Sequence, residues 1–498
     1  MEYLLSHDMG TSGDKAVLFD IEGRVVAETT ACYPIGYPFE KAVEQDPLDW
    51  WAAFCTASKE LLSKTGASPA DILAVSFSAQ MNSCLPVDAQ GRPLRKAMIW
   101  ADQRAGEQAE KIIGKLGLDP VYHLTGQRLS ASHAIAKMAW FKEHEAGLYK
   151  KTAMFLQPKD FLAFMLTGHM GSDYSDASHL GCLDMKRLAW SEEMLDTAGI
   201  SMDRMPELRL STAIVGKVTR QAARECGLLE GTLVVAGGGD GACATAGAGV
   251  TQAGEAYCAM GTSAWIAAMS ENPYFDPEMR TFNLVCLDGR HYMPLGSVQS
   301  AGHSLKWAAD TLYLDWEPDR FFSRLPDIIM SVPAGSRGLI FLPYLLGERS
   351  PWWNPDATGC FIGLTARHTR ADMLRSVLEG VGLNLKIVLD SLTEGIEIRD
   401  FSVIGGAARN PAWLQILADI WQRPLKMPAM LEYAASAGAA LCAGVGAGVY
   451  SSLEAAAKVN PTRLMILPAE GNAAVYAAAL QRFLRIFRAL EPAAFSGK

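Results

Sequence analysis

The chain lacks the sequence features of several protein classes. Its ten cysteines are scattered with no Cys-x-x-Cys pair, which excludes a zinc ribbon and gives no disulfide framework. No block rich in Lys and Arg occurs and the net charge is −9, so we expect no nucleic-acid partner. The first residues lack the basic and then apolar pattern of a secretory leader, which predicts a cytoplasmic protein. No Gly-x-x-x-x-Gly-Lys-Ser/Thr loop is present, so a P-loop is excluded.

A long hydrophobic run of the kind that spans a membrane is also missing. The longest uncharged stretch, residues 433–452, approaches the length of a membrane span and contains Gly444-x-x-x-Gly448. It is rich in Ala, Gly and Ser rather than in Leu or Ile, which favours close helix packing in a protein core. We therefore expect no membrane partner.

Chain length and a repeated tetrapeptide predict two domains. The sequence has 498 residues, 49% hydrophobic and 20% charged, and this length exceeds what one hydrophobic core usually supports. Met-Gly-Thr-Ser occurs twice, beginning at Met9 and at Met260, close to the midpoint. No long disordered linker separates the halves. We therefore expect two packed domains, residues 1–250 and 251–490, with a cleft between them.

Both copies of Met-Gly-Thr-Ser lie between strand-like apolar segments, which is typical of a tight hairpin. Glycine allows unusual dihedral angles there, and backbone N–H groups point outward beside the Thr and Ser hydroxyls. Such a turn can hold a phosphate; the alternative is two ordinary hairpins that share four common residue types. The predicted phosphate donors are Gly10, Thr11 and Ser12 in the first copy and Gly261, Thr262 and Ser263 in the second.

The remaining sequence alternates strands with helices, which predicts an α/β layer in which helices cover a mixed sheet. A helix is expected within residues 46–66, after an Asp cap and Pro and before Gly. The last helix is expected over 473–490, ending before Pro492. Further expected elements are strands at 3–5, 16–19, 23–33, 71–81, 256–259, 264–268 and within 280–296, a helix at 370–392, and a strand, Gly turn and helix over 400–421.

A third glycine-rich segment contains Gly237-x-Gly239-x-x-Ala242, a loose dinucleotide-binding pattern. That pattern requires a parallel β-α-β unit with an acidic residue at the end of the next strand. The second Met-Gly-Thr-Ser hairpin follows instead, so the segment only weakly supports a dehydrogenase.

A series of ordered segments gives a clearer indication. They are DMGTSGDKAVLFD (8–20), EQDPLDWW (44–51), SAQMNS (78–83), MIWADQRA (98–105), LQPKDFLAFMLTG (156–168), SDYSDAS (172–178), GGGDGA (237–242), MGTS (260–263), FLPYLLGERSPWWNPDATGCFIGLT (341–365), VLEGVGLNL (377–385) and GGAARNPAWLQILADI (405–420). Across nearly the whole chain they resemble the FGGY carbohydrate kinases, and among these the xylulokinase-like members.

The resemblance implies a fold, an activity and cofactors. The fold would be α/β, with two actin-like, ribonuclease H-like domains, each a mixed β-sheet flanked by helices, and the active site in the interdomain cleft. The activity would be transfer of the γ-phosphate of ATP, with Mg²⁺, to a hydroxyl of a small ketose or polyol. Phosphoryl transfer needs oriented phosphate donors, a divalent cation and a base near the attacking hydroxyl.

The resemblance also implies roles for individual residues. Asp240 would be the general base, ionised at neutral pH with an ordinary pKa of about 4, although a turn-forming Asp is the alternative. Asp8 and Asp240 would hold Mg²⁺. The turn Gly405-Gly406-Ala407 would open a helix and bind the nucleotide together with Asn410. The implied substrate-binding residues are Gln80, Met81, Asn82, Trp100, Asp102 and Asp240; Arg104, Asp176 and Glu348 are further cleft candidates, and the histidines are interpreted as structural or solvated.

The sequence departs from its relatives at two positions. The xylulokinases that the chain resembles have Gln-Met-His at the first position and Asp-Asn at the second. This chain has Gln80-Met81-Asn82 and Asp240-Gly241 there. Because two potential hydrogen-bonding groups differ, we expect D-xylulose to be a poor substrate. The alternatives are a kinase of a non-pentulose substrate, such as an aldonate or an autoinducer-type linear dihydroxy-dione, a catalytically silent sugar sensor, and a non-catalytic nucleotide switch. The sequence leaves the oligomeric state open, with a homodimer as the candidate.

Overall fold

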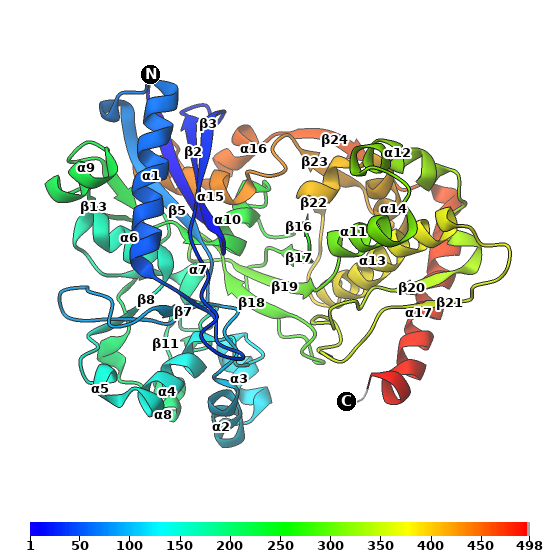
Figure 1. Cartoon of the computed structure of the whole chain (residues 1–498), viewed down its shortest axis with the longest axis horizontal. Helices are drawn as coiled ribbons and strands as arrows, with labels where there is room; N and C mark the ends of the chain where they lie inside the picture. The colour runs from blue at the N-terminus through cyan, green and yellow to red at the C-terminus, as the bar shows by residue number, and fades with distance from the viewer. Residues whose placement is uncertain (496–498) are drawn as a thin grey trace.

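The computed structural model describes residues 1–495 and shows a molecule of two lobes (Figure 1). Each lobe contains a seven-stranded sheet with parallel and antiparallel pairs, flanked by helices. The N-terminus lies in the first lobe, and the chain ends at the lower edge of the second. This arrangement confirms the predicted class of two α/β units with mixed sheets.

The first sheet is organised around the predicted hairpin of β1 (Tyr3–Met9) and β2 (Gly13–Asp20). β1 pairs antiparallel with β2 and parallel with β5 (Ile72–Ala79). The sheet order is β13 (Ile214–Lys217), β14 (Leu233–Val235), β5, β1, β2 and β3 (Val25–Cys32), and the short strand β15 (Gly238–Gly239) pairs with the end of β5. The carboxyl ends of β1, β5 and β15 therefore meet at one edge, where α/β sheets bind ligands.

The second sheet repeats this plan. β16 (Glu255–Met260) pairs antiparallel with β17 (Ala264–Ala268) and parallel with β22 (Asp400–Ile404). The order is β18-β19-β17-β16-β22-β23-β24. The turn of the second hairpin therefore lies beside the segment after β22, as the first turn lies beside the segment after β5.

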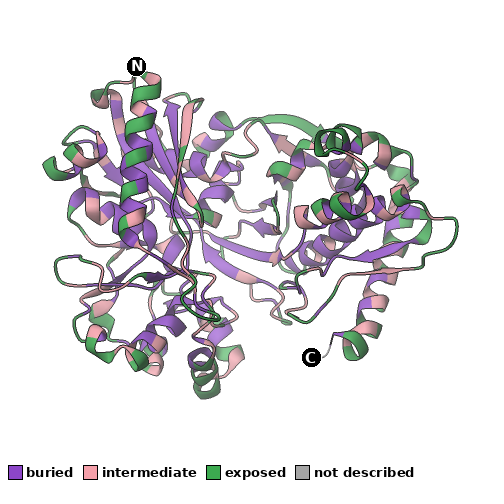
Figure 2. Ribbon diagram, viewed as in Figure 1, coloured by how far each residue is buried: buried purple, intermediate pink, exposed green. Residues whose placement is uncertain are grey.

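Alternation of side chains along β1 builds a core on both faces of the first sheet. Leu5 packs with helix α1 (Pro47–Thr65), whereas its neighbour Leu4 packs with α15 (Ala434–Gly446). α1 begins as expected, because the Asp46 side chain caps the N–H of Leu48 and Gly66 ends the helix in the left-handed conformation. Figure 2 shows the central strands β1, β2 and β5 as almost continuously buried.

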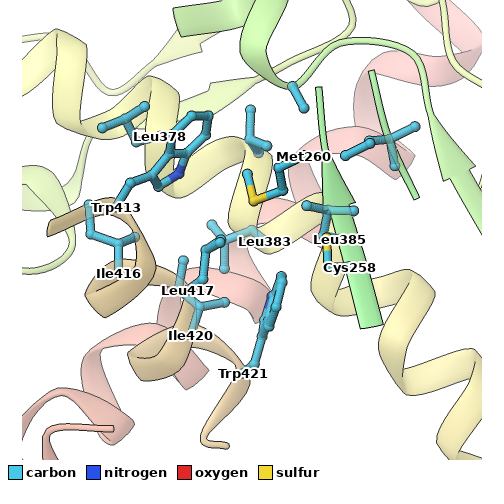
Figure 3. Packing of buried hydrophobic residues seen from close by; sticks show 14 of the residues in the cluster. Cys258, Met260, Leu378, Leu383, Leu385, Trp413, Ile416, Leu417, Ile420 and Trp421 are labelled. Carbon is cyan, nitrogen blue, oxygen red and sulfur yellow. The ribbon is translucent and has the colours of Figure 1, made fainter. Parts of the chain in front are cut away.

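The core of the second lobe lies between its sheet and two long helices. Figure 3 shows Cys258 and Met260 of β16 packed against α13 (Arg370–Thr393) and α14 (Pro411–Trp421). Leu378, Leu383 and Trp413 are among the buried residues of this cluster. Met260 immediately precedes the second hairpin turn, so the turn is anchored in this core.

Helix α10 (Asp240–Gly247) and α15 form the junction between the lobes. α10 contributes Ala242 to the core of the first lobe and Ala244 to a cluster with the second sheet. The two helices cross in backbone contact, since a Cβ on Gly247 would lie 1.8 Å from the Ala434 oxygen and one on Gly438 would lie 2.1 Å from the Cys243 oxygen. The predicted close packing of the Ala- and Gly-rich stretch is confirmed.

α15 comes from the second half of the sequence but covers the first sheet. The division into residues 1–250 and 251–490 therefore stays a prediction. Within residues 1–495, no helix is long and apolar enough to cross a membrane.

Two local expectations are wrong. The last helix, α17 (Ala473–Ala494), continues through Pro492. Pro492 lies in the final turn, so the N–H that it lacks removes one hydrogen bond near the end of the helix and leaves the preceding turns intact. Residues 406–409 form only a short 3₁₀ turn, and α14 begins later, at Pro411, because Asn410 is its cap.

The other elements complete the two lobes. The remaining helices are α2 (Gly106–Leu116), α3 (Leu118–Thr125), α4 (Ala134–His144), α5 (Ala146–Tyr149), α6 (Pro158–Thr167), α7 (Tyr174–Ala177), α8 (Glu192–Ala198), α9 (Arg220–Cys226), α11 (Gly302–Leu312), α12 (Pro318–Met330) and α16 (Ala456–Val459). The remaining strands of the two large sheets are β3 (Val25–Cys32), β13 (Ile214–Lys217), β14 (Leu233–Val235), β18 (Phe282–Val285), β19 (Tyr292–Val298), β23 (Leu425–Pro428) and β24 (Thr462–Ile466). Shorter paired strands are β4 (Glu44–Gln45), β6 (Leu85–Val87), β7 (Ala97–Met98), β8 (Met154–Leu156), β9 (Ser172–Asp173), β10 (Leu183–Asp184), β11 (Ala189–Trp190), β12 (Leu208–Arg209), β20 (Ile340–Leu342) and β21 (Cys360–Ile362).

Candidate active site between the two lobes

A cavity of about 540 Å³ is lined by residues from both lobes. Thr11 of the first hairpin and Ser263 of the second both reach it, and Asp240 lies in its wall. The predicted residues Gln80, Met81, Asn82 and Trp100 line it as well. Topology explains most of this grouping, because Thr11, the segment Gln80–Asn82 and Asp240 follow the ends of β1, β5 and β15, which meet at one sheet edge.

A run of glycines brings Asp240 to this edge. Gly237 has a φ of +66°, and a Cβ on it would lie 2.0 Å from the main-chain oxygen of Phe77 in β5. A Cβ on Gly239 would lie 2.5 Å from the sulfur of Met81. Only glycine permits this close approach, so the loop lies against β5 and places Asp240 beside the segment of Met81.

Asp240 is the first residue of α10, and its side chain is exposed to the cavity. The protein packed around the cavity limits its solvation, and this desolvation, followed by the charge of Asp8, raises its pKa to about 7. The hydrogen bond from the Gly241 N–H, at 2.7 Å, opposes the rise. The expectation of an ordinary pKa near 4 is therefore wrong. A carboxyl with a pKa near 7 is well matched to accept a proton at neutral pH.

Asp8 lies at the end of β1 and accepts a hydrogen bond from the Ser78 hydroxyl at 2.7 Å. Burial is the main cause that raises its pKa, to about 6, and Asp14 adds to the rise. Among the described residues no group of three or more His, Cys, Asp or Glu could hold a metal. Asp8 and Asp240 are thus a pair of electrostatically coupled carboxylates rather than a complete protein-only metal site.

The first hairpin turn is joined to the opposite wall by side-chain hydrogen bonds. Gln45 donates to the Thr11 oxygen at 2.6 Å and accepts from Gln80 at 2.8 Å. Trp100 donates to the Thr11 hydroxyl at 3.0 Å. The Gly10 N–H is used within the turn, bonding the oxygens of Asp8 and Gly13, so it is not a free phosphate donor in this conformation.

The segment after β5 has two features suited to a polar ligand. The Oε1 atom of Gln80 is buried and has no hydrogen-bond partner within residues 1–495. Asn82 adopts a left-handed conformation, with a φ of +61°, which Asn tolerates better than most residues. Its Oδ1 accepts a hydrogen bond from the N–H of Ala134, the first residue of α4, at 3.3 Å.

The segment Trp100–Gln103 is only partly as expected. Trp100 and Gln103 line the cavity, but Asp102 does not. Asp102 is fully buried and binds Arg104 at 2.7 Å and the Val43 N–H at 2.7 Å. The structure therefore places Asp102 and Arg104 behind the wall, where they hold the loop in position.

Asp176 and Glu348 also lie behind the wall. Asp176 is fully buried 3.6 Å from the Lys159 nitrogen, in a cluster with Asp160 and Asp173. Glu348 accepts hydrogen bonds from the N–H groups of Gln299 and Arg349 and from Asn384. His7 is structural, as expected, bonding Asp14 at 2.7 Å and Ser58 at 3.2 Å.

A second cavity, of about 590 Å³, adjoins the second hairpin. Gly261 and Thr262 line it together with Gly406, Ala407 and Asn410. Gly405 is not on this wall, but its φ of +92° and the lack of a Cβ let it lie against the Met260 oxygen, 2.6 Å from the Cβ position. The Oδ1 of Asn410 caps the N–H groups of Ala412 and Trp413, so only its amide nitrogen is left for a ligand.

Several cavity residues have no counterpart among the sequence predictions. Arg128 and Arg349 reach the cavity from opposite lobes, and His133 and His179 lie in its wall. The two imidazole rings stack with centroids 5.7 Å apart. Burial lowers the pKa of His133 to about 4, and it also lowers the pKa of His179 well below its ordinary value. Both rings are therefore neutral at neutral pH. Whether either ring contacts a ligand stays a prediction, as does the interpretation of the histidines as structural or solvated.

Transfer of a phosphate between two small molecules needs oriented phosphate donors and a group that positions or deprotonates the acceptor, and two hairpin turns and a carboxylate at one cavity match these needs. The fold and this geometry define an α/β phosphotransferase with its site between two lobes. The chain belongs to the FGGY family of carbohydrate kinases, whose N-terminal domain matches residues 3–247 and whose C-terminal domain matches residues 256–447.

Individual relatives extend over almost the whole chain. A xylulose kinase from Bacillus subtilis (strain 168) is 36% identical over 462 residues, covering 92% of this chain and 91% of that protein. A gluconokinase from the same organism is 31% identical over 500 residues, covering 98% and 97%. The crystal structure of a ligand-bound xylulose kinase from Lactobacillus acidophilus has a TM-score of 0.92 at 27% identity, covering 99% of both chains. The protein is an ATP-dependent sugar kinase.

Proposed function

We propose that Asp240 is the general base of this kinase. The acceptor hydroxyl would give its proton to the Asp240 carboxylate while its oxygen forms a bond to the γ-phosphorus of ATP and the bond from that phosphorus to ADP breaks. The observation that carries this proposal is the position of Asp240, whose carboxylate faces a cavity reached by Thr11 and Ser263. Its pKa near 7 suits the reaction at neutral pH.

The nucleotide is proposed to extend from the second cavity to the two hairpins. Gly261, Thr262, Gly406, Ala407 and Asn410 line the second cavity and would hold its adenosine end. Backbone N–H groups and hydroxyls of Thr11, Ser12, Thr262 and Ser263 would bind the phosphates, with Gly10 shaping the first turn. Gly405 would contribute by letting its loop approach the second hairpin.

The Asp8 and Asp240 pair fits Mg²⁺. The charge of Asp8 is one cause of the raised pKa of Asp240, so a nearby divalent cation would relieve an existing repulsion. Mg²⁺ keeps several waters and is usually held by one or two carboxylates, which agrees with a pair and not with a larger cluster. When bound, it would neutralise charge on the transferred phosphate.

The substrate is proposed to differ from D-xylulose. Asn82 uses its Oδ1 to cap α4, so it offers the cavity only its amide nitrogen. Gly241 leaves space, because the atoms nearest to a Cβ there are those of Met293 and Leu284, at 3.5 and 3.6 Å. The relatives include both xylulose kinases and a gluconokinase, so their names alone leave several sugar classes open.

Asp240→Asn tests the proposed base. We expect sugar-dependent ADP release to fall about 100-fold or more while nucleotide affinity stays near that of the wild type, since a lost general base commonly costs this much. Turnover within a few-fold of wild type would exclude the role. ADP release without any sugar, equal in the variant and the wild type, would favour a nucleotide switch instead.

Two further proposals concern the state of the protein in the cell. All ten cysteines are free thiols, as is usual in a reducing compartment, which supports a location in the cytoplasm.

A homodimer stays a prediction. Light scattering of the purified protein during size-exclusion chromatography measures the mass of the assembly directly.

A further inference from the structure

Two guanidinium groups, those of Arg128 and Arg349, line the 540 Å³ cavity. Arg128 follows α3 in the first lobe, and Arg349 precedes the Pro351–Trp353 turn in the second. Neither guanidinium forms an ion pair or a hydrogen bond with residues 1–495. The acidic group that acts on Arg349 is the adjacent Glu348, and burial raises the pKa of that carboxyl to about 8, so at neutral pH it is mostly uncharged. The recorded contact of Arg128 is with the face of the Trp353 ring, 5.4 Å from its centroid.

The rest of the wall does not neutralise these two charges. Asp240 is the one acidic residue among the described residues that line the cavity. His133 and His179 are neutral, and the other polar lining groups, such as Gln103, Ser130 and Gln299, are uncharged. A guanidinium is only a donor of hydrogen bonds, so the wall requires a ligand rich in acceptors.

The position of Arg349 argues for contact with the acceptor molecule. Its charge contributes to the lowered pKa of both His133 and His179, which belong to the wall of the first lobe. The causes of the shifted pKa of Asp240 are burial, Asp8 and Gly241, and neither arginine is among them. The side-chain hydrogen bonds of Asp8 and Asp240, where we place the transferred phosphate, are with Ser78 and the Gly241 N–H and not with either arginine.

Arg128 is half-buried and Arg349 is exposed to the cavity, so Arg128 in particular is partly withdrawn from water, which favours binding of an anion. Burial lowers the pKa of both arginines, although an arginine stays protonated at neutral pH. A carboxylate accepts two parallel hydrogen bonds from one guanidinium, which gives orientation as well as affinity. A neutral ketose or alditol has no group of this kind.

We propose that the phosphate acceptor is a sugar acid, whose carboxylate is bound by Arg128 and Arg349 while one of its hydroxyls faces Asp240. This inference rests on the proposed placement of the acceptor in the cavity that Asp240 faces. The same arginines could instead bind the γ-phosphate of ATP, which is the other source of an anion in this reaction. If the arginines bind the carboxylate, removing one of them weakens binding of the acceptor. If they bind the γ-phosphate, removing one of them weakens binding of ATP.

The first measurement compares acceptors of equal length that differ in charge. D-gluconate is compared with D-glucitol and D-xylonate with xylitol, with D-xylulose as the neutral ketose, using ADP release. We expect the preferred aldonate to exceed its matched alditol and D-xylulose in kcat/KM by about 10- to 100-fold, the scale of one charge-assisted hydrogen-bonded pair. A neutral acceptor in first place overturns the inference and leaves the kinase intact; no ADP release with any acceptor contradicts the kinase activity itself.

The second measurement removes each charge. Arg128→Gln and Arg349→Gln should each lower kcat/KM for the aldonate by about tenfold or more, through KM, with KM for ATP unchanged. Arg128→Lys should keep part of the preference because it keeps the charge. Arg187→Gln is the matched control, since its side chain is 84% exposed and lies outside the cavity. A raised KM for ATP together with unchanged aldonate selectivity would show that the arginines hold phosphate.

Calorimetric titration of D-gluconate into the wild-type protein and Arg128→Gln provides a test that does not depend on turnover. We expect binding that is tighter than that of D-glucitol, that weakens with added salt and that is reduced in the variant. Equal binding of the acid and the alditol contradicts the inference. Thermal unfolding of each variant identifies any loss of folding.

Discussion

The side-chain nitrogen of Lys137 donates a hydrogen bond to the main-chain oxygen of Asn82 at a distance of 2.8 Å. The same nitrogen donates to the oxygen of Ile99 at 2.7 Å. Lys137 is fully buried in α4. It therefore ties together two segments of the cavity wall, one carrying Asn82 and the other carrying Trp100.

Lys137→Met should weaken acceptor binding. Methionine has a similar length but no donor, so both main-chain oxygens lose their partner and the left-handed conformation of Asn82 loses one of its two restraints from α4. We expect KM for the acceptor to rise about tenfold, with KM for ATP nearly unchanged. Steady-state kinetics with each substrate varied in turn measures both values. Lys142→Met, in the same helix but bonded to the Gly199 oxygen, is the control; an equal rise in both KM values would indicate general loss of structure instead.

Lys137 should also make stability depend on pH. Burial lowers its pKa to about 7, compared with about 10.4 for an unfolded lysine. Between these values the unfolded chain holds a proton that the folded protein has released, so this group makes stability rise with pH across that window. A neutral amine has two N–H donors, which match the two carbonyl oxygens.

Urea unfolding of wild type and Lys137→Met at several pH values from about 6 to 9.5 tests this expectation. The free energy of unfolding of the wild type should increase relative to that of the variant above pH 7, and the difference should be constant below it. A difference that stays constant over the whole range would mean that Lys137 is charged in the folded protein.

The crossing of α10 and α15 predicts a strong effect of a single methyl group. In Gly438→Ala the new Cβ would lie 2.1 Å from the Cys243 oxygen, so the two helices must separate at the junction of the lobes. We expect the free energy of unfolding to fall by about 2–3 kcal/mol. Gly114→Ala is the control, because its Cβ would meet nothing within 4 Å and it lies inside α2, where Ala is favoured over Gly. Chemical denaturation that finds both variants equally stable would contradict the described crossing.

The sequence predicted the elements that carry local signals. The two hairpins, the Asp46 cap of α1 and the glycine approach to Asp240 all follow from residue types at fixed spacing. The Ala- and Gly-rich stretch indicated close packing, but not that α15 would cover the first sheet, because that contact joins distant parts of the chain. Periodicity describes the face of a helix, not its partner.

The cavity wall was predictable only in part. Trp100 and Asp102 belong to the same loop, and no alternation rule tells which of its side chains face inward; the structure turns Gln103 to the cavity and Asp102 away from it. Arg128 and Arg349 are single charged residues in loops, and they reach one cavity only because the lobes pack together. The pKa of Asp240 depends on the same packing, so an isolated residue value could not give it.

The last prediction concerns Gly241, beside the proposed base. The expected substrate difference rests on two positions, but Asn82 has a structural role in capping α4, so Asn82→His would disturb that helix as well as the cavity. Gly241 has no such role as a side chain, and a Cβ there would be in ordinary contact with Met293 and Leu284. Gly241→Asn should therefore fit and add a donor and an acceptor at the cavity wall.

We expect Gly241→Asn to raise kcat/KM for D-xylulose, relative to that for the best acceptor, about tenfold, which is the scale of one matched hydrogen bond to a substrate hydroxyl. Gly106→Asn, in the first turn of α2, with nothing within 4 Å of its Cβ position and outside the cavity, controls for the substitution itself. Parallel kinetics with D-xylulose and the best acceptor decides the matter: an unchanged ranking in a folded Gly241→Asn protein means that this position does not set the choice of sugar.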